Sequence, residues 1–380
     1  MRVLQFGKSY PPIEGGIETA ILNITEGLNA RNIRCDVLGS NSENSYVLQT
    51  VGQYNIYRTK SYGKLFSTSL SPQLIRKYSL IKDDYDIIHI HFPDPLAAAA
   101  MFLYRPKGKV VVHWHSDIIK QRYLVKPLQP LISWLLNCAD AIIATSGAYA
   151  ESSEYLRGYA AKTVVIPFGI KTSGLKPNEN KVAEIRDRYK GKTIIYALGR
   201  LVYYKGFDYL IEAAGLLSDD YVVVIGGDGP LLNKLRQSIA AKRLTGKVFL
   251  PGSIRGSDIG SYYEACDIFC LPSTERSEAF GIALVEAMSF GKPLITANIP
   301  TGVSWVNQDG ETGLVVKPKD ALELKRAIET ISTDEQVYRY FSNNCRERYN
   351  AIFSQDKMID TIISLYSDLS GRPMRERETR

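Results

Sequence analysis

The order of apolar stretches and helical patterns most constrains this chain, because the same order begins twice. In the first half, an apolar stretch at 2–6 is followed by a glycine-containing loop and a helix-period stretch at 17–30. The second half begins again with an apolar stretch at 193–198, another glycine-containing loop and a helical pattern at 207–217. Strands that alternate with helices form parallel sheets. The sequence therefore predicts an α/β fold of two successive halves with parallel sheets, whose ligands bind at the carboxyl ends of the strands.

A segment rich in glycine, proline and asparagine, at 167–180, separates the two halves and is the best linker candidate. The 380 residues are enough for two or three domains of about 150 residues each. We expect an N-terminal domain at 1–169, a second domain at 170–350 and a C-terminal helix at 351–380. Helical patterning runs through 320–369, and we expect the tail to be frayed.

The composition is that of a globular protein rather than a membrane-spanning, disordered or disulfide-rich one. The longest apolar run has eight residues, at 96–103, whereas a membrane span needs roughly 18. The amino-terminal residues lack the apolar stretch and cleavage site of a signal peptide. The five cysteines are scattered and form no C-x-x-C pair, so we expect buried thiols rather than disulfides. These features predict a cytoplasmic protein.

Positive charge is concentrated in one stretch of the first half. Residues 58–126 contain twelve Lys and Arg and five Asp, so this stretch accounts for the whole net charge of +7. Aromatic residues lie among the basic ones, as at Tyr57-Arg58 and Lys77-Tyr78. The pattern fits an anionic membrane surface or a phosphorylated lipid, and it also fits a solvated face. No nucleic-acid-binding motif accompanies it, so we expect no nucleic-acid partner.

The four histidines of the chain fall into two His-x-His pairs at the ends of predicted strands. The pairs are His89 with His91 and His113 with His115. Side chains two residues apart share one face of a strand, so the imidazoles of each pair should lie together. Two interpretations remain open. The first is a metal site completed by Asp94 or Asp117. The second is a polar wall in which one or two imidazoles contact a ligand while the others bond to backbone.

Two loops of the second half carry groups that suit a diphosphate. Gly199-Arg200 ends one predicted strand and Lys205-Gly206 closes the loop that follows, which gives the pattern G-R-x4-K-G. An arginine fork and a lysine point charge can converge on phosphate oxygens. A glycine turn at 226–230 ends the next strand and leads into another helix.

A third segment places two acidic residues around the start of a helix. Glu278 lies before the predicted helix and Glu286 lies inside it. The backbone N–H groups near Phe280, Gly281 and Ile282 can hold a phosphate, because a helix N-terminus carries partial positive charge. The two carboxylates can then bond hydroxyl groups on either side, which suits a sugar–diphosphate–ribose ligand. The alternative is a plain helix whose N-terminal acid is favoured by the helix dipole.

Together, G-R-x4-K-G, G-G-D-G-P and E-A-F-G-I-A-L-V-E-A-M-S-F-G-K-P resemble motifs of the retaining glycosyltransferases of family four. Gly15-Gly16, the DIIHIH strand and HWHSD also match, so the resemblance covers nearly the whole chain. It implies the GT-B fold, in which the parallel sheets of two Rossmann-like domains face a deep cleft and the last helix crosses back to the first domain. It also implies transfer of a sugar from a nucleoside-diphosphate sugar without a metal or any other cofactor.

The resemblance implies roles for individual residues. Glu278 would bond hydroxyls of the donor sugar, and Glu286 would bond the ribose. The expected catalytic residues are His115, Arg200, Lys205 and Glu278. The expected nucleotide-sugar site comprises Gly15, Gly16, Gly199, Arg200, Lys205, Gly227, Ser253, Ile254, Glu278, Ala279, Phe280, Gly281, Ile282 and Glu286. The expected acceptor side comprises Gly16, His91, His113, Asp117 and Lys120.

Two positions depart from the family pattern. Phe168-Gly169-Ile170-Lys171 stands where the family often has N-G-I-D, so we assign no ligand contact there. His113 stands where a threonine often precedes the catalytic histidine by two positions.

The stretch HWHSDIIKQ is similar to members of the family that act on lipid-linked oligosaccharides in bacterial O-antigen and capsule assembly. We therefore expect transfer of a hexose or N-acetylhexosamine from a UDP-sugar, or secondly from GDP-mannose, to a saccharide on polyprenyl diphosphate. The basic stretch would hold the protein on the cytoplasmic face of the inner membrane. The alternatives are a nucleotide-sugar epimerase or a phosphorylase of the same fold, or a non-catalytic partner in polysaccharide assembly.

Overall fold

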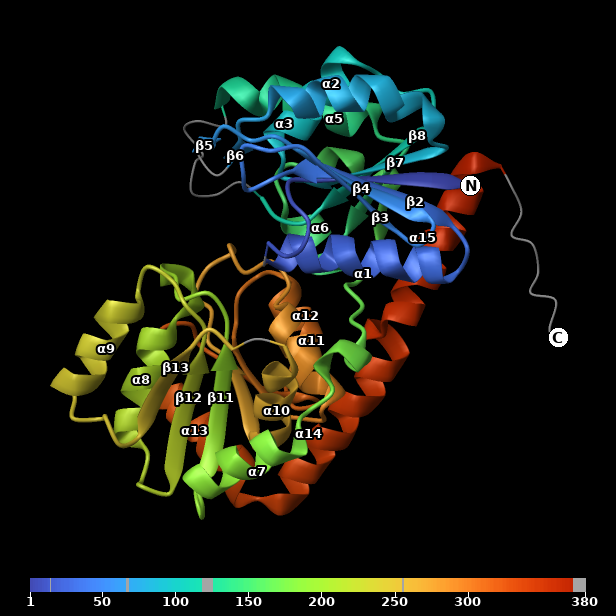
Figure 1. The fold of residues 1–380 in the computed structure, drawn as a ribbon. Helices are drawn as coiled ribbons and strands as arrows, with labels where there is room; N and C mark the ends of the chain where they lie inside the picture. The colour runs from blue at the N-terminus through green and yellow to red at the C-terminus, as the bar shows by residue number, and fades with distance from the viewer. Residues whose placement is uncertain (14, 66–67, 118–125, 255, 372–380) are drawn as a thin grey trace. The chain divides into compact units, whose positions relative to one another are not determined.

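The computed structural model describes residues 1–371 apart from 14, 66–67, 118–125 and 255, and it contains two compact units (Figure 1). Unit 1 comprises Met1–Gly169 and the segment that begins at Gln355, and unit 2 comprises Ile170–Ser354. The predicted acceptor-side residue Lys120 lies outside the described residues. Among the residues that are described, no helix has the length and apolar character needed to cross a membrane.

Unit 1 is built on an eight-stranded sheet in which only the edge strand β3 runs antiparallel to its neighbour. The strand order is β10-β9-β8-β7-β1-β2-β4-β3. The bounds are β1 (Arg2–Phe6), β2 (Arg34–Ser40), β3 (Val47–Val51), β4 (Tyr54–Thr59), β7 (Ile87–Phe92), β8 (Lys109–Trp114), β9 (Ala141–Ala144) and β10 (Thr163–Val165), with a separate pair β5 (Lys64–Leu65) and β6 (Thr68–Ser69). The sequence predicted the strands other than β3–β6. It missed β3 because every side chain of that strand is exposed, so no apolar alternation marks it.

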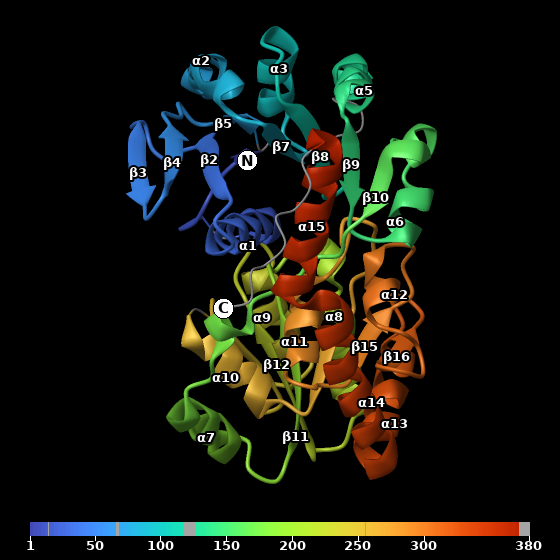
Figure 2. The ribbon, with the colours of Figure 1, turned by 90° about the vertical axis from the view of Figure 1, so that its right-hand side faces the viewer.

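Helices cover both faces of this sheet (Figure 1, Figure 2). One face carries α2 (Pro72–Ile81), α3 (Pro95–Leu103) and α5 (Gln129–Cys138), and the other carries α1 (Gly16–Ala30) and α15 (Gln355–Ser370). The shorter helical segments are η1 (Lys82–Asp84), η2 (Lys126–Leu128), α6 (Gly147–Ser152) and η3 (Arg157–Lys162). Apolar side chains of α1 and α15 pack against one residue from each of the central strands, so α15 is part of the core of unit 1.

Unit 2 contains a six-stranded parallel sheet with the order β13-β12-β11-β14-β15-β16. Its strands are β11 (Thr193–Leu198), β12 (Tyr221–Gly226), β13 (Val248–Gly252), β14 (Ile268–Leu271), β15 (Leu294–Ala297) and β16 (Gly313–Val316). Its helices are η4 (Thr172–Leu175), α7 (Glu179–Arg188), η5 (Tyr203–Lys205), α8 (Phe207–Leu216), α9 (Leu232–Ala241), α10 (Ser257–Ala265), α11 (Ile282–Ser289), α12 (Gly302–Val306), α13 (Ala321–Thr333), α14 (Glu335–Arg348) and the π-helical turn η6 (Tyr349–Phe353). The predicted α/β class with two parallel sheets is confirmed.

The carboxyl-terminal helices differ from the expected continuous helical stretch. The π-helical turn η6 follows α14, and Ser354 then adopts an extended backbone, so the last helix begins at Gln355 rather than at 351. The backbone explains the break, because Ile170 donates its N–H to the Phe353 carbonyl and pairs with Ser354. The buried Phe353 ring packs at right angles to Trp305, which holds this turn against unit 2.

Candidate active site

The strand order of unit 2 places a topological switch point in the middle of its sheet. The first strand, β11, lies between β12 and β14, and the chain moves outward from it in both directions. In open α/β sheets the loops on either side of such a switch point separate and leave a crevice. Here those loops carry Gly199-Arg200 after β11 and Ser273 through Glu278 after β14.

An ion pair joins the two loops across this switch point. The Lys205 ammonium lies 2.6 Å from a Glu278 carboxylate oxygen, and each side chain is only 11% exposed. The Ser273 hydroxyl donates to the same oxygen at 2.9 Å. Lys205 passes directly over Gly199, because a Cβ there would lie 3.1 Å from the Lys205 Cε and Nζ. The predicted diphosphate cation and the predicted sugar-binding acid therefore meet side by side.

Two glycines permit the close approach of the loops that form the crevice. Gly227 has φ +136°, and a Cβ there would lie 2.0 Å from the Gly199 carbonyl oxygen. Gly206 has φ +68°, and a Cβ there would lie 2.2 Å from the Pro272 carbonyl oxygen. Both backbones adopt conformations that disfavour any side chain, so glycine is required at both turns.

Arg200 and the start of α11 are the other groups of this edge that suit an anion. The Arg200 side chain is exposed and makes no hydrogen bond or ion pair with any part of the chain that the structure describes. Gly281 is the N-cap of α11 in the left-handed conformation, with φ +80°, and no side chain caps the helix. The first backbone N–H groups of α11 are thus left for a ligand or water.

The second acid, Glu286, lies on α11 in a different environment. The Tyr263 hydroxyl donates to its carboxylate at 2.7 Å. Burial raises the pKa of Glu286, while the hydrogen bond from Tyr263 and the charge of Lys205 oppose this shift. Lys205 therefore acts electrostatically on both predicted acids. Tyr263 holds the Glu286 carboxylate in place, and the sequence did not reveal this role.

The remaining predicted residues of unit 2 lie around the same edge. Ser253 and Ile254 follow β13, and the Ile254 side chain packs so closely on Gly226 that a Cβ there would lie 2.5 Å from its Cδ1. The Ala279 carbonyl accepts a hydrogen bond from the Gly302 N–H at 2.8 Å. The Phe280 ring is buried, so this residue can offer only its backbone to a ligand.

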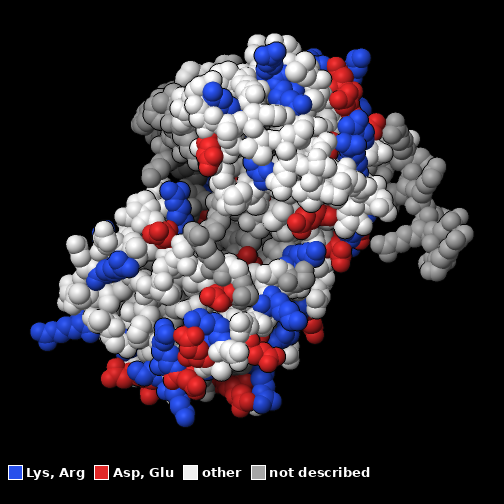
Figure 3. Space-filling view, in the orientation of Figure 1, with Lys and Arg blue, Asp and Glu red and all other residues white. Residues whose placement is uncertain are grey.

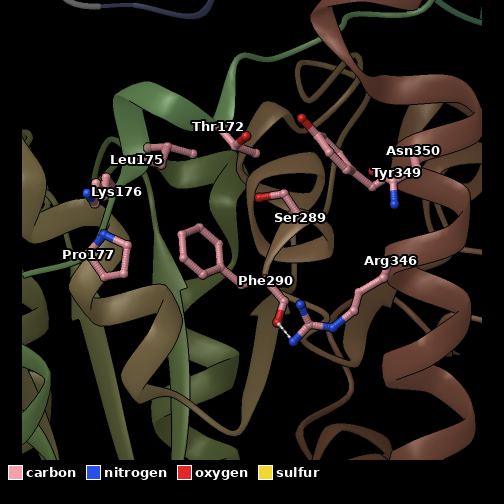
Figure 4. Close-up of a pocket in the computed structure, with 9 residues that line it drawn as sticks. All are labelled: Thr172, Leu175, Lys176, Pro177, Ser289, Phe290, Arg346, Tyr349 and Asn350. Carbon is pink, nitrogen blue, oxygen red and sulfur yellow. Dashed lines mark hydrogen bonds between the residues drawn. The ribbon is translucent and has the colours of Figure 1, made fainter. Parts of the chain in front are cut away.

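A cavity of about 520 Å³ in unit 2 is separate from this edge (Figure 4). It lies at the carboxyl end of α11, where Arg346 donates a hydrogen bond to the Phe290 carbonyl, and it contains none of the predicted site residues. Its lining includes Leu175 and Tyr349.

In unit 1 the predicted glycine turn lies where expected. Gly15 is the N-cap of α1, and Gly16 is its first residue. The helix follows β1, which lies at the switch point between β2 and β7. The Thr19 N–H donates to the Gly15 carbonyl at 2.9 Å, and no side chain caps the helix.

The histidines form one buried stack on β7 and β8. The rings of His91 and His115 have centroids 5.0 Å apart at 14°, and those of His113 and His115 have centroids 4.3 Å apart at 13°. His89 stacks on His91 at 4.7 Å with an interplanar angle of 3°. Burial lowers the pKa of every one of them, that of His113 to about 3, so the imidazoles are neutral at physiological pH.

This geometry favours the polar wall over the metal site. Ring nitrogens of His89, His91 and His113 lie within 4.8 Å of one another. However, an imidazole binds a metal through a lone pair in its own plane, and nearly parallel planes cannot direct their lone pairs to one ion. The two candidate acids are also engaged elsewhere. Asp94 caps α3, and Asp117 accepts hydrogen bonds from the Trp114 indole and the Ser153 hydroxyl. Both acids thus have structural hydrogen bonds of their own, and metal binding by the imidazoles stays a prediction.

Two residues of the stack were not found from the sequence. The Gln5 oxygen lies 2.6 Å from His91 Nε2, and the Tyr366 hydroxyl bonds to His89 Nδ1. Gln5 is the one polar residue of β1 after Arg2, and a lone polar residue in a buried apolar strand could have marked it as a partner of other polar groups. Tyr366 reaches the stack from α15, which no local pattern could show.

Two family models match this chain in succession. The one described as Glycosyltransferase Family 4 covers 14–173, and the one described as Glycosyl transferases group 1 covers 178–348. O-antigen chain mannosyltransferase C of Escherichia coli is 36% identical over 97% of this chain and 99% of its own length. The chain belongs to the family-four glycosyltransferases.

Other comparisons agree with this assignment. D-rhamnosyltransferase WbpZ of Pseudomonas aeruginosa is 34% identical to this glycosyltransferase, over 93% of this chain and 92% of its own. The crystal structure of Anabaena HepE in complex with UDP superposes with a TM-score of 0.77, at 22% identity, over 97% of this chain and 100% of its own. The GT-B fold expected for this glycosyltransferase is confirmed.

Proposed function

We propose that this glycosyltransferase moves a hexosyl group from a nucleoside-diphosphate sugar to a hydroxyl of a saccharide carried on polyprenyl diphosphate, with retention at the anomeric carbon. The observation that carries the proposal is the Lys205–Glu278 pair at the switch point of unit 2. A cation and an acid so placed suit the two ends of one ligand, the diphosphate and the sugar. The relatives named for mannose and D-rhamnose favour GDP-mannose over a UDP-sugar as the donor.

The chemistry follows from where charge develops. The bond between the anomeric carbon and the diphosphate oxygen breaks, so negative charge grows on the leaving group. Arg200, Lys205 and the N-terminus of α11 offer positive charge to it, and each such donor is worth roughly 3 kcal/mol, or about two decades of rate. The acceptor oxygen bonds the anomeric carbon on the same face, and its proton passes to the leaving phosphate. These protein groups can take the role that a metal ion has in other transferases.

The two acids would bind different parts of the donor, and each is held in place by a neighbouring side chain. Glu278, oriented by Ser273 and Lys205, would bond hydroxyls of the transferred sugar. Glu286, held by Tyr263, would bond the ribose. His115, in unit 1, would offer its imidazole to a sugar hydroxyl.

The direct test compares alanine variants of Arg200, Lys205 and Glu278 in transfer assays with GDP-mannose and UDP-sugars. We expect each variant to lose about two decades of kcat/KM with the preferred donor. Lys190→Ala, an exposed cation just before the amino end of β11, is the matched control and should keep wild-type activity. Activity within about threefold of wild type in all three test variants contradicts the assignment. An absolute need for added magnesium contradicts the metal-independent step.

We also propose that unit 1 docks on an anionic membrane surface through α2 and α3. The basic stretch does not form one continuous patch, since Lys82 pairs with Asp83 and Lys109 with Asp140. On the face of unit 1 in Figure 3, basic and acidic side chains are likewise intermixed.

What supports docking is the combination of apolar and basic side chains on one layer of helices. Leu80 is 70% exposed, Phe102 is 55% exposed and Leu103 is 59% exposed, on helices that pack together. Arg76 and Arg105, on or next to the same helices, are also exposed. Apolar side chains that enter the interface between basic ones are typical of peripheral membrane binding.

Liposome co-sedimentation tests this surface. Wild type should bind anionic vesicles in a salt-sensitive way, and Phe102→Ser with Leu103→Ser should lose most of that binding. Leu216→Ser, which changes an equally exposed leucine on α8 of unit 2, is the control and should bind as wild type does. No binding of wild type at low ionic strength would end the docking proposal.

A further inference from the structure

The buried histidines form two hydrogen-bonded rows that each end at a nitrogen without a partner. In the first row Gln5 Oε1 lies 2.6 Å from His91 Nε2, and His91 Nδ1 lies 2.8 Å from His115 Nε2. In the second, Tyr366 Oη bonds His89 Nδ1, and His89 Nε2 lies 3.2 Å from His113 Nδ1. Among the described residues, nothing hydrogen-bonds His115 Nδ1 or His113 Nε2, although both atoms are buried. A buried polar atom without a partner is rare and points to a missing ligand or water.

The first row fixes which nitrogen of His115 carries the proton. A neutral imidazole has one N–H donor and one bare acceptor nitrogen. In the orientation that the Gln5 amide has here, its oxygen faces His91 Nε2 and can only accept, so His91 Nε2 carries the proton and His91 Nδ1 is bare. His115 Nε2 then carries the proton that it donates to His91. The remaining nitrogen, His115 Nδ1, is therefore a bare acceptor.

The second row has the opposite polarity at its end. Burial raises the pKa of Tyr366 well above its usual value, so its hydroxyl keeps its proton and can donate it to His89 Nδ1. His89 Nε2 then donates to His113 Nδ1, which leaves His113 Nε2 with a proton. One row thus ends in an acceptor and the other in a donor, and the two ends belong to stacked rings 4.3 Å apart.

We propose that Gln5 is a positioning residue that acts through His91 to hold His115 in the tautomer with a bare Nδ1. A bare nitrogen accepts a hydrogen bond from a hydroxyl and cannot donate one to a phosphate oxygen. His115 Nδ1 can therefore accept a hydrogen bond from a sugar hydroxyl and cannot donate one to a phosphate. This inference rests on the proposed function for its ligand, but the tautomer itself does not depend on it.

The tautomer can be read without any activity. Nitrogen-15 chemical shifts distinguish protonated from bare imidazole nitrogens, and the chain has only four histidines to assign. We expect His115 to be protonated at Nε2 and bare at Nδ1 in the unliganded full-length protein. A His115 protonated at Nδ1, or at both nitrogens, at neutral pH overturns the proposal. Zinc-induced shifts of all four rings would instead identify a metal site and would also overturn it.

Variants of Gln5 test its control of the tautomer. Gln5→Met keeps the volume but removes the acceptor, so His115 should populate both tautomers. Gln5→Glu restores an acceptor and should restore the single tautomer. Tyr78→Phe is the matched control, because it removes the hydroxyl of a buried tyrosine of unit 1 that takes part in neither row, and it should leave His115 unaltered. If Gln5→Met leaves the His115 spectrum unchanged in a folded protein, Gln5 does not set the tautomer. Should Gln5→Met fail to fold, the result with Gln5→Glu and the wild-type spectrum still decide the question.

Kinetics with deoxy-sugar donors test whether His115 accepts a hydrogen bond from a sugar hydroxyl. Gln5→Met should lower kcat/KM about tenfold with the normal donor, the loss expected for one hydrogen bond of about 1.4 kcal/mol. This effect should vanish with the one deoxy donor that lacks the contacted hydroxyl. An equal loss with every deoxy donor would refute the hydroxyl contact. If wild type transfers no sugar at all, the proposed function fails, whereas the spectra still test the tautomer.

Discussion

The buried histidine stack should make unit 1 steeply sensitive to mild acid. Every histidine of the chain is in this stack, and burial lowers the pKa of each, that of His113 to about 3. In the unfolded chain a histidine has a pKa near 6.5. The unfolded state therefore binds more protons than the folded state below that pH, and the free energy of unfolding falls as pH falls.

The size of the effect follows from the linkage relation. Between about pH 7 and about pH 5, a histidine that stays neutral in the folded state loses roughly 2 kcal/mol of stabilisation. Four such histidines together would lose up to about 8 kcal/mol, which is comparable to the whole stability of a typical domain. Ordinary carboxyl groups titrate mainly below this window, so they contribute little to the change.

Hydrogen exchange measured by mass spectrometry can report on each unit separately. Peptides from β7 and β8 should lose protection steeply over this pH range after correction for the intrinsic exchange rate. Peptides from β12 provide the internal control, because unit 2 contains no histidine. Equal, shallow pH dependence in the two sets of peptides would show that the rings are solvated or already protonated, and it would refute the argument from burial.

Two further outcomes follow from the crevice of unit 2. Gly206→Ala should destabilise the protein by about 3 kcal/mol in urea unfolding, because of the positive φ and the Pro272 carbonyl. Gly246→Ala, which adds a methyl group in open space, should stay within about 0.5 kcal/mol of wild type, and similar losses in both would refute this account. Tyr263→Phe removes the hydrogen bond that lowers the pKa of Glu286, so that pKa should rise further and nucleotide affinity should fall. Calorimetric titration with nucleotide at several pH values checks this, and an unchanged affinity and pH profile would show that Tyr263 does not support Glu286.

Much of the site was predictable because its signals are local. The strand–loop–helix order placed Gly199, Lys205 and Glu278 at carboxyl ends of parallel strands, and the structure has them there. The same local order placed each His-x-His pair on one face of its own strand. Apolar periodicity and glycine turns depend on neighbouring residues, so a sequence displays them directly.

Residue partners across the fold were decided only by the tertiary structure. Lys205 and Glu278 looked like separate ligand contacts, and only the order of β11 next to β14 made them an ion pair. Tyr366 lies 277 positions from His89, the ring to which it bonds. The proton arrangement of the histidines depends on such contacts, because a neutral imidazole takes its tautomer from its hydrogen-bond partners. Those partners are neighbours in space rather than along the chain.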